Sequence, residues 1–189
     1  MEFWIAIFGG TAVLVAQWAL ISLVALGSLR RRVQAALREL DGPMRHYLED
    51  AATAVETARG FGTEVQVLRR QREAREQLEV FLGALASGPM EQLDLEEFRK
   101  AWSNCLRSNQ AVNHAVLGLP CVVEGWVGQQ GDLETRSNRV SKALDDYNRA
   151  VQEYEYRWHK GATSLAARWF GYGRLEEWPT EEVSTQQGW

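Results

Sequence analysis

No charged residue lies between Glu2 and Arg30, and three arginines, Arg30, Arg31 and Arg32, end this uncharged run. A membrane-crossing helix needs about 20 mostly apolar residues. A helix of this run extends roughly 40 Å at about 1.5 Å per residue, which crosses a hydrocarbon core of about 30 Å with some tilt. The sequence therefore predicts a single transmembrane anchor over residues 1–29.

A cleaved signal peptide is the alternative for this segment. Such a peptide has a basic start and an apolar stretch of about 7–15 residues, whereas here acidic Glu2 precedes a longer run. Retention of the anchor is therefore favoured. Lysine and arginine close to a span favour the cytoplasmic side, so Arg30, Arg31 and Arg32 predict a cytoplasmic soluble domain. A periplasmic or extracellular domain is the alternative topology.

The rest of the chain, from Arg30 to Trp189, is long enough for one domain with a real core. It holds all 21 Lys and Arg and 24 of the 25 Asp and Glu, a net charge of −3, so no basic face for nucleic acid is expected. The two cysteines, Cys105 and Cys121, lack CxxC spacing. They predict neither a disulfide scaffold nor a zinc site.

Apolar residues after the arginines recur at alternating steps of four and three. This seam consists of Val33, Leu37, Leu40, Met44, Tyr47, Ala51, Ala54, Ala58 and Phe61. A heptad seam predicts one long helix with a partner on that face. Asp41-Gly42-Pro43 interrupts it because proline lacks a backbone donor. We therefore expect a kink, or two coaxial helices with Asp41 capping the second.

Three further amphipathic helices follow. Their expected ranges are 64–86 with Thr63 as N-cap, 93–117 and 132–158, with an irregular glycine-rich segment at 121–131. Short links between four such helices predict an all-α protein, an antiparallel four-helix bundle over residues 30–175 on a single N-terminal transmembrane helix. Residues 176–189 are predicted to be a flexible acidic tail.

Two stretches resemble the LemA family. The first runs from Val55 to Phe61, reading Val-Glu-Thr-Ala-Arg-Gly-Phe. The second combines Tyr-Asn-Arg-Ala-Val-x-x-Tyr at 147–154 with Leu-Ala-Ala-Arg-Trp-Phe-Gly-Tyr at 165–172. The matching motif positions are Glu56, Tyr147, Asn148, Phe170 and Gly171.

Two motifs of the family are replaced in this chain. Glu49-Asp50-Ala51-Ala52-Thr53-Ala54 stands where the family has an Asp-Leu-Ile-Pro-Asn-Leu turn, and Gly161-Ala162 stands where it has Phe-Pro. The chain therefore resembles a divergent member. The resemblance implies a helical bundle with a short C-terminal helix, in the inner (cell) membrane of a bacterium. It implies no known catalytic activity. It also implies associations with membrane remodelling and with membrane proteases.

The sequence predicts no metal, cofactor or catalytic site. His46, His114 and His159 fall on different expected helices or helix ends, whereas zinc needs about four ligands. Gly60-Phe61-Gly62 lacks the strand and the third glycine of a dinucleotide fingerprint. We interpret Tyr147 as a buried aromatic whose hydroxyl finds a partner across the bundle, and Asn148 as a hydrogen-bonding partner for a neighbouring helix or its own loop.

Aromatic and basic residues gather near the C-terminus. An antiparallel path of four helices returns this segment to the membrane side, where such side chains favour the headgroup region. The expected lipid contacts are Trp158, Arg168, Trp169, Phe170, Tyr172 and Trp178, with Arg157, Lys160 and Arg174 among them. The alternative is that Leu165, Trp169 and Phe170 cap the open end of the bundle core.

Two functions of different classes follow from this organisation. The first is a membrane-anchored scaffold or adaptor without catalysis, which binds lipid or another membrane protein. The second is an accessory subunit of a membrane protease, or an enzyme with an unrecognised pocket. Small residues four apart in the span, such as Ala12 and Ala16, and the polar Gln17 also raise self-association as an expectation.

Overall fold

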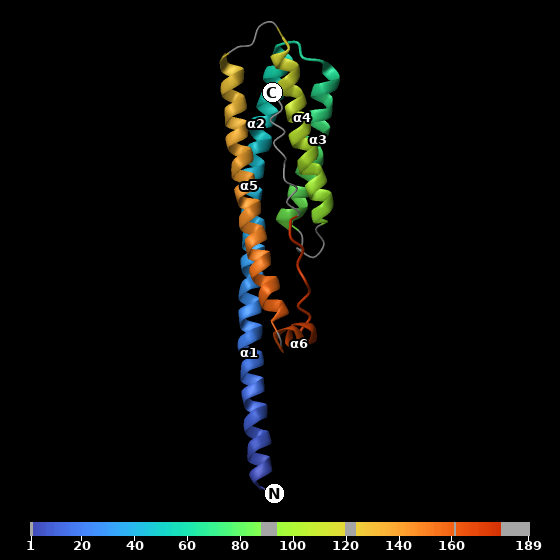
Figure 1. The fold of residues 1–189 in the computed structure, drawn as a ribbon. Coiled ribbons are helices and arrows are strands. Elements are labelled where there is room, and N and C mark those ends of the chain that lie inside the picture. Colours follow the sequence, from blue (N-terminus) through green and yellow to red (C-terminus); the bar gives the residue numbers. More distant parts are fainter. Residues whose placement is uncertain (1, 88–93, 120–123, 161, 179–189) are drawn as a thin grey trace. The chain divides into compact units, whose positions relative to one another are not determined.

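The computed structural model describes residues 2–87, 94–119, 124–160 and 162–178, and within these ranges every regular element is a helix (Figure 1). The helices are α1 (Glu2–Glu39), α2 (Asp41–Gly60), α3 (Val65–Ser87), α4 (Leu95–Leu117), α5 (Glu124–His159) and α6 (Ala162–Trp169). The all-α prediction is confirmed. The long apolar helix at the N-terminus is present, and α6 provides the short C-terminal helix.

The heptad seam is buried as predicted. Every seam residue from Val33 to Ala58 lies at or below 3% exposure, and Phe61 is half-buried. The equivalent seam of α5 is also buried, and comprises Leu133, Val140, Leu144, Tyr147, Val151, Tyr154 and Trp158. Residues three and four apart share one face of a helix, so this spacing identified the inward faces of both helices.

A single residue, Leu40, separates α1 from α2. Its backbone keeps helical angles, φ −68° and ψ −30°, and no side chain caps α2. Asp41 is the first residue of α2, and its carboxylate instead accepts from Nε of Arg45 at 2.8 and 2.9 Å. The expectation that Asp41 caps the second helix is therefore wrong. Pro43 is tolerated because it lies in the first helical turn, where the backbone N–H has no partner within the helix.

Thr63 belongs to the end of α2 and does not cap α3. Gly62 adopts φ +79°, and its N–H donates to the Arg59 carbonyl at 3.1 Å, while the Thr63 N–H donates to the Ala58 carbonyl at 3.3 Å. This pair of bonds is a Schellman motif, which needs a residue with positive φ. The predicted N-cap at Thr63 is wrong because α3 begins at Val65, one residue later than this cap requires, and the buried Thr63 hydroxyl has no hydrogen-bond partner among the described residues.

Helix α4 begins as an aspartate-capped helix, since the Asp94 carboxylate accepts from the Glu97 N–H at 2.9 Å. Helix α5 begins at Glu124, well before the expected start at Asp132. Each glycine in this turn-prone stretch costs about 1 kcal/mol of helix stability. Trp126 offsets that cost: its ring is 1% exposed and packs edge-on against Phe61 at 6.2 Å. Residues 121–123 lie outside the described ranges.

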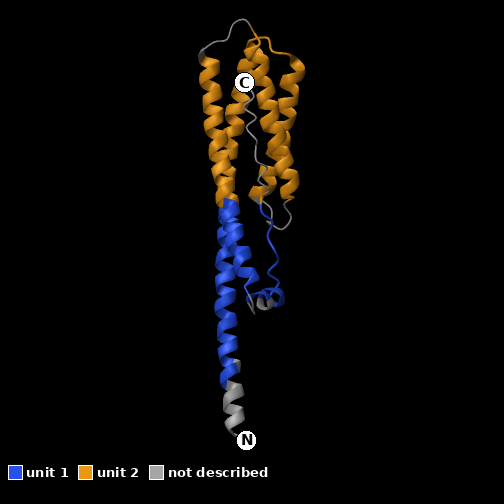
Figure 2. Cartoon of the chain, viewed as in Figure 1, with its two compact units in different colours: residues 1–36, 147–177 blue, residues 37–146, 178–189 orange. Residues whose placement is uncertain are grey.

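The chain divides into two compact units (Figure 2). Unit 1 contains residues 1–36 and 147–177, and unit 2 contains residues 37–146 and 178–189. This division differs from the predicted boundary after Leu29, because the apolar N-terminal residues group with the C-terminal part of α5 and with α6. The predicted anchor segment therefore does not form a unit of its own.

Unit 2 contains the packed helices α2, α3 and α4 together with residues 124–146 of α5. Helix α3 packs on α4 and on α2, and α2 packs on α4. The Tyr47 hydroxyl accepts from the Asn109 amide at 2.8 Å, and the Tyr47 ring meets Trp102 edge-on at 5.0 Å. Arg136 of α5 pairs with Asp50 of α2 at 3.0 Å.

The predicted tail starts too early. The Glu176 carbonyl accepts a hydrogen bond from Tyr147 at 3.0 Å. Trp178 is 4% exposed, and its ring packs edge-on against Phe98 at 4.9 Å within unit 2. The expectations that residues 176–178 are loose and that Trp178 meets lipid are therefore wrong, because these residues are bonded or buried. Residues 179–189 lie outside the described ranges.

Replacing Leu78 by alanine tests the core of unit 2. Leu78 is 0% exposed, so Leu78→Ala should lower the free energy of unfolding by about 2–5 kcal/mol, as loss of a buried leucine commonly does. Val80 on the same helix is 72% exposed, so Val80→Ala should cost no more than about 0.5 kcal/mol. Urea denaturation of the full chain in detergent, followed by circular dichroism, measures both. Equal losses of unfolding free energy in the two variants would contradict the burial of Leu78 in the core of unit 2.

Candidate functional site

Helix α1 is long and apolar enough to cross a membrane. Six of its large side chains between Val13 and Val24 are 62–66% exposed in unit 1, namely Val13, Leu14, Val15, Leu20, Ile21 and Val24, while Leu23 is half-buried. The exposure ends at Leu26, which is 0% exposed. The apolar run therefore has an outward-facing part and, at its C-terminal end, a part that belongs to the packed interior of unit 1.

An extended segment, residues 172–177, follows α6 and is here called the strap. Three side chains on the C-terminal part of α5 hold its backbone. The Trp158 indole N–H donates to the Tyr172 carbonyl at 3.0 Å, the Tyr154 hydroxyl to the Gly173 carbonyl at 2.8 Å, and the Tyr147 hydroxyl to the Glu176 carbonyl at 3.0 Å. The strap thus runs along one face of α5 in the opposite direction.

Two further bonds complete this contact. The Leu175 N–H donates to a Glu155 carboxylate oxygen at 2.9 Å, and the Gln152 amide donates to Glu177 at 3.2 Å. Buried backbone carbonyl and amide groups need partners, and here side chains provide them. Tyr147 therefore bonds to the strap, whereas the sequence suggested a partner across the bundle. Asn148, the next motif residue, is buried at 8% exposure.

Gly171 turns the chain from α6 into the strap. Its φ is +73°, the Gly171 N–H donates to the Arg168 carbonyl at 3.4 Å, and the Tyr172 N–H donates to the Ala167 carbonyl at 2.9 Å. This is a Schellman motif at the end of α6. A residue with a Cβ strains this conformation, so the motif position Gly171 serves the geometry of the turn.

The strap also reaches α1. A Cβ built on Gly27 would lie 3.2 Å from the Tyr172 hydroxyl oxygen, so glycine at this position leaves room for that ring. The Arg30 guanidinium lies 5.8 Å from the centre of the Tyr172 ring. Arg32 pairs with Glu153 of α5 at 3.2 Å, and Arg31 is exposed. Two of the three arginines, Arg30 and Arg32, therefore contact the C-terminal part of unit 1.

Two aromatic side chains at the end of α6 are unusually exposed. Trp169 is 89% exposed and Phe170 is 63% exposed, and Arg168 beside them is exposed. The expected cap of the bundle core therefore does not form from Trp169 and Phe170; the Leu165 side chain lies outside the described residues. Exposed apolar side chains that adjoin one another mark contact surfaces.

The other expected lipid contacts divide differently. Trp158 is 5% exposed, so its predicted position on the surface is wrong: its indole bonds to the strap. Tyr172 is half-buried. The guanidinium groups of Arg168 and Arg174 lie 5.9 and 5.2 Å from the Trp158 ring, within cation–π range. The buried Trp158 ring thus lies within cation–π range of two arginines of unit 1.

Charge is unevenly divided along the chain. The segment from Arg157 to Arg174 contains four lysines and arginines and no aspartate or glutamate. Unit 1 holds eight Lys and Arg against five Asp and Glu, and the residues of unit 2 hold 13 against 20. The net charges are therefore +3 and −7. The positive unit is the one that contains the apolar helix α1.

The remaining motif and histidine positions form local pairs. Glu56 is exposed and lies 3.9 Å from Arg59. His46 contacts Glu49 at 3.4 Å, and His159 contacts Glu155 at 3.3 Å. Among the described residues, no three His, Cys, Asp or Glu side chains are grouped to hold a metal ion.

Unit 2 contains a buried thiol and a hollow lined by charged side chains. Cys105 is fully buried, and burial raises the pKa of its thiol to about 12, so the unreactive thiol form prevails at neutral pH. A hollow of about 330 Å³ between α2 and α3 is lined by Arg45, Glu49, Arg75 and Glu79 with Leu48, Ala52 and Leu82. Arg75 pairs with Glu79 at 3.4 Å, and Arg45 pairs with Asp41, so carboxylates balance both cations.

Comparison with known proteins adds no family. The chain matches no protein-family profile, and a search of curated proteins finds no match.

Replacing Tyr147 by phenylalanine tests the strap contact through pH. Burial, and then the nearby Glu176 carboxylate, raise the pKa of Tyr147 from its ordinary value of 10.0 to about 12. A raised pKa means that the folded chain holds the hydroxyl proton more tightly than the unfolded chain. The contribution of this hydroxyl to stability is therefore fully present below about pH 10, the pKa of tyrosine in the unfolded chain, and it is lost between pH 10 and 12. Tyr147→Phe should reduce this fall and should cost about 0.5–1.5 kcal/mol at pH 8.

The measurement is urea denaturation of the full chain in detergent from pH 8 to pH 11. Tyr156→Phe is the control at pH 8, since the Tyr156 ring on the same helix is 63% exposed, and it should change stability by less than about 0.5 kcal/mol. If the free energy of unfolding falls with alkaline pH as steeply in Tyr147→Phe as in the unmodified chain, this hydroxyl does not hold the strap.

Proposed function

We propose that this protein is a membrane-anchored helical scaffold or adaptor of the LemA type, which binds membrane lipid and a membrane protein and has no catalysis of its own. In this proposal α1 is the single transmembrane anchor in the inner membrane of a bacterium. Helices α2 to α5 form an antiparallel four-helix bundle that the anchor holds at the membrane.

The length of the uncharged apolar run in α1 supports the anchor. The segment from Phe3 to Val24 contains no charged residue. As a helix it extends roughly 33 Å at about 1.5 Å per residue, close to the hydrocarbon thickness of about 30 Å. The packed residues Leu26 and Gly27 then fall at the headgroup level, next to Arg30.

The observation that carries the proposal is the exposure of Trp169 and Phe170 on the same unit as α1. Apolar surface left in water costs about 25 cal/mol per Å², and a membrane interface removes that cost. Helix α6 runs across the direction of α1 (Figure 1), as an interfacial helix lies in the plane of a membrane. Aromatic rings favour the headgroup region, so we infer that α6 rests on the membrane surface.

The charge division supports the same arrangement. Each lysine or arginine near an anionic leaflet gains about 1 kcal/mol, and the positive charge lies in unit 1. The motif positions Tyr147 and Gly171 also gain a role, because they shape the strap and the turn that place α6. The LemA resemblance supports a non-catalytic role.

Arg30, Arg31 and Arg32 predict the topology. Alkaline phosphatase fused after Trp189 should be inactive and a fluorescent protein at that position should fluoresce, because the arginines keep the domain cytoplasmic. Replacing all three arginines by glutamine should raise phosphatase activity in the first fusion. High phosphatase activity in the unmodified chain would instead support the periplasmic or extracellular alternative.

Spin labels test whether α6 meets the membrane. Full-length protein in vesicles carries a nitroxide on Trp169→Cys or Phe170→Cys, and on Val80→Cys as the control, each with Cys121→Ser. Oxygen concentrates in lipid and a polar nickel complex in water. In electron paramagnetic resonance, oxygen should speed the spin relaxation of the labels at 169 and 170 more than nickel does. Nickel should speed the relaxation of the label at 80 more than oxygen does. Equal nickel responses at all three positions would contradict the interfacial placement of α6.

A further inference from the structure

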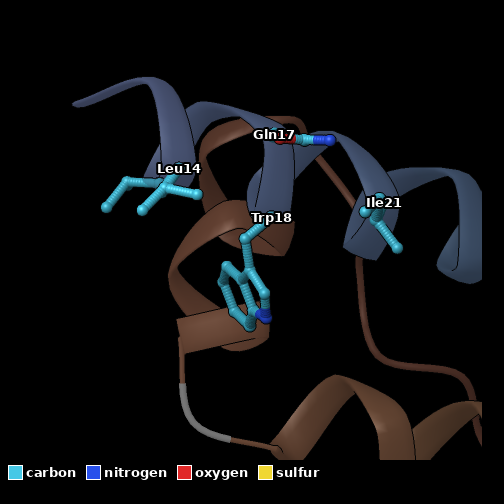
Figure 3. Close-up of a pocket in the computed structure, with 5 residues that line it drawn as sticks. Leu14, Gln17, Trp18 and Ile21 are labelled. Carbon is cyan, nitrogen blue, oxygen red and sulfur yellow. The ribbon is translucent and has the colours of Figure 1, made fainter. Parts of the chain in front are cut away.

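A shallow hollow lies along the exposed part of α1. Its volume is about 520 Å³, and it is lined by Leu14, Val15, Gln17, Trp18 and Ile21 (Figure 3). Four of these five side chains are apolar, and Trp18 is 44% exposed. In Figure 3 the Trp18 ring extends away from the axis of α1. The hollow is therefore an apolar seat on α1, in the same unit as the short helix α6.

Unit 1 also carries a basic segment that includes α6. Helix α6 ends in Arg168 and Trp169, and the segment from Arg157 to Arg174 contains no acidic residue. Arg168 and Arg174 are positioned by the Trp158 ring at 5.9 and 5.2 Å. Arginine binds phosphate oxygens through a planar set of N–H donors. The chemistry of unit 1 thus combines an apolar seat with a phosphate-binding end.

We propose that unit 1 binds one anionic phospholipid, with an acyl chain in the hollow beside Trp18 and its phosphate at the cations of α6. This inference rests on the proposed membrane anchoring of α1, and it adds selectivity for a lipid class. The volume is in the range of small-molecule sites, about 300–1,000 Å³, and is small for a partner helix. A free phosphate would leave the apolar seat empty, so charge and apolar lining together identify the lipid.

Native mass spectrometry of the full chain in mild detergent tests the site. Phosphatidylglycerol and phosphatidylcholine with identical acyl chains are added in equal amounts. The unmodified protein should retain one phosphatidylglycerol in about tenfold preference, as expected when a charge-assisted bond is added. Arg168→Gln should remove the preference and leave the two lipids bound equally.

Trp18→Ala should lower retention of both lipids, because it enlarges the hollow and removes its aromatic wall. Leu20→Ala is the matched control: Leu20 is 64% exposed on the same helix and does not line the hollow. Its lipid retention should equal that of the unmodified chain. Equal loss in both variants, or none in Trp18→Ala, would overturn the site.

Other occupants give different results. Displacement of phosphatidylglycerol by millimolar inorganic phosphate would show a simple anion site, and a dimer that Trp18→Ala disrupts without bound lipid would show a second copy of the chain. Either result overturns the inference. Carbonate extraction of membranes separates this failure from that of the proposed function. A chain that carbonate releases is not anchored at all, whereas a retained chain without lipid preference refutes the lipid site alone.

Discussion

The geometry of unit 1 depends on the hydrogen bonds that the α5 aromatics donate to the strap. Tyr147, Tyr154 and Trp158 donate to backbone carbonyls at 2.8–3.0 Å. An extended segment without a neighbouring strand has no other regular way to satisfy its carbonyl groups. These bonds fix the path of the chain after α6, and through Gly171 they fix where α6 ends. The exposure of Trp169 and Phe170 follows from that path.

The helices themselves were largely predictable from the sequence. The alternating steps of four and three identified the buried faces of α2 and α5, because burial of an apolar stripe decides which face turns inward. The errors arose where tertiary contacts override local preference. Trp126 keeps a glycine-rich stretch helical through its contacts with Phe61 and with Asn113, whose side chain accepts from the indole N–H at 3.0 Å. Thr63 is of a residue type that often caps helices, but α3 starts at Val65 and the Thr63 hydroxyl is buried without a partner among the described residues.

The candidate site was predictable only in part. The gathering of aromatic and basic residues near the C-terminus pointed to the segment that carries the exposed Trp169 and Phe170 rings, but periodicity could not tell which rings were buried. Trp158 and Trp169 lie on the same segment and are of the same type, yet they are 5% and 89% exposed. Side-chain bonds to an irregular backbone leave no repeat in the sequence. The sequence did contain one signal for the strap: Tyr147, Tyr154 and Trp158, which can all donate hydrogen bonds, lie on one face of a helix, and Gly171 follows at the end of the next helix.

The close approach of Tyr172 to Gly27 limits where this chain can be truncated and which apolar helix can replace its own. Because Leu26 is fully buried and Gly27 admits the Tyr172 ring, the last turn of the apolar run is also part of the interior of unit 1. A soluble version that starts at Arg30 would lose both residues and leave an unfilled space under the strap. A foreign anchor with bulky residues at these two positions would displace Tyr172. The helix α1 of this protein is therefore not interchangeable with a generic apolar helix.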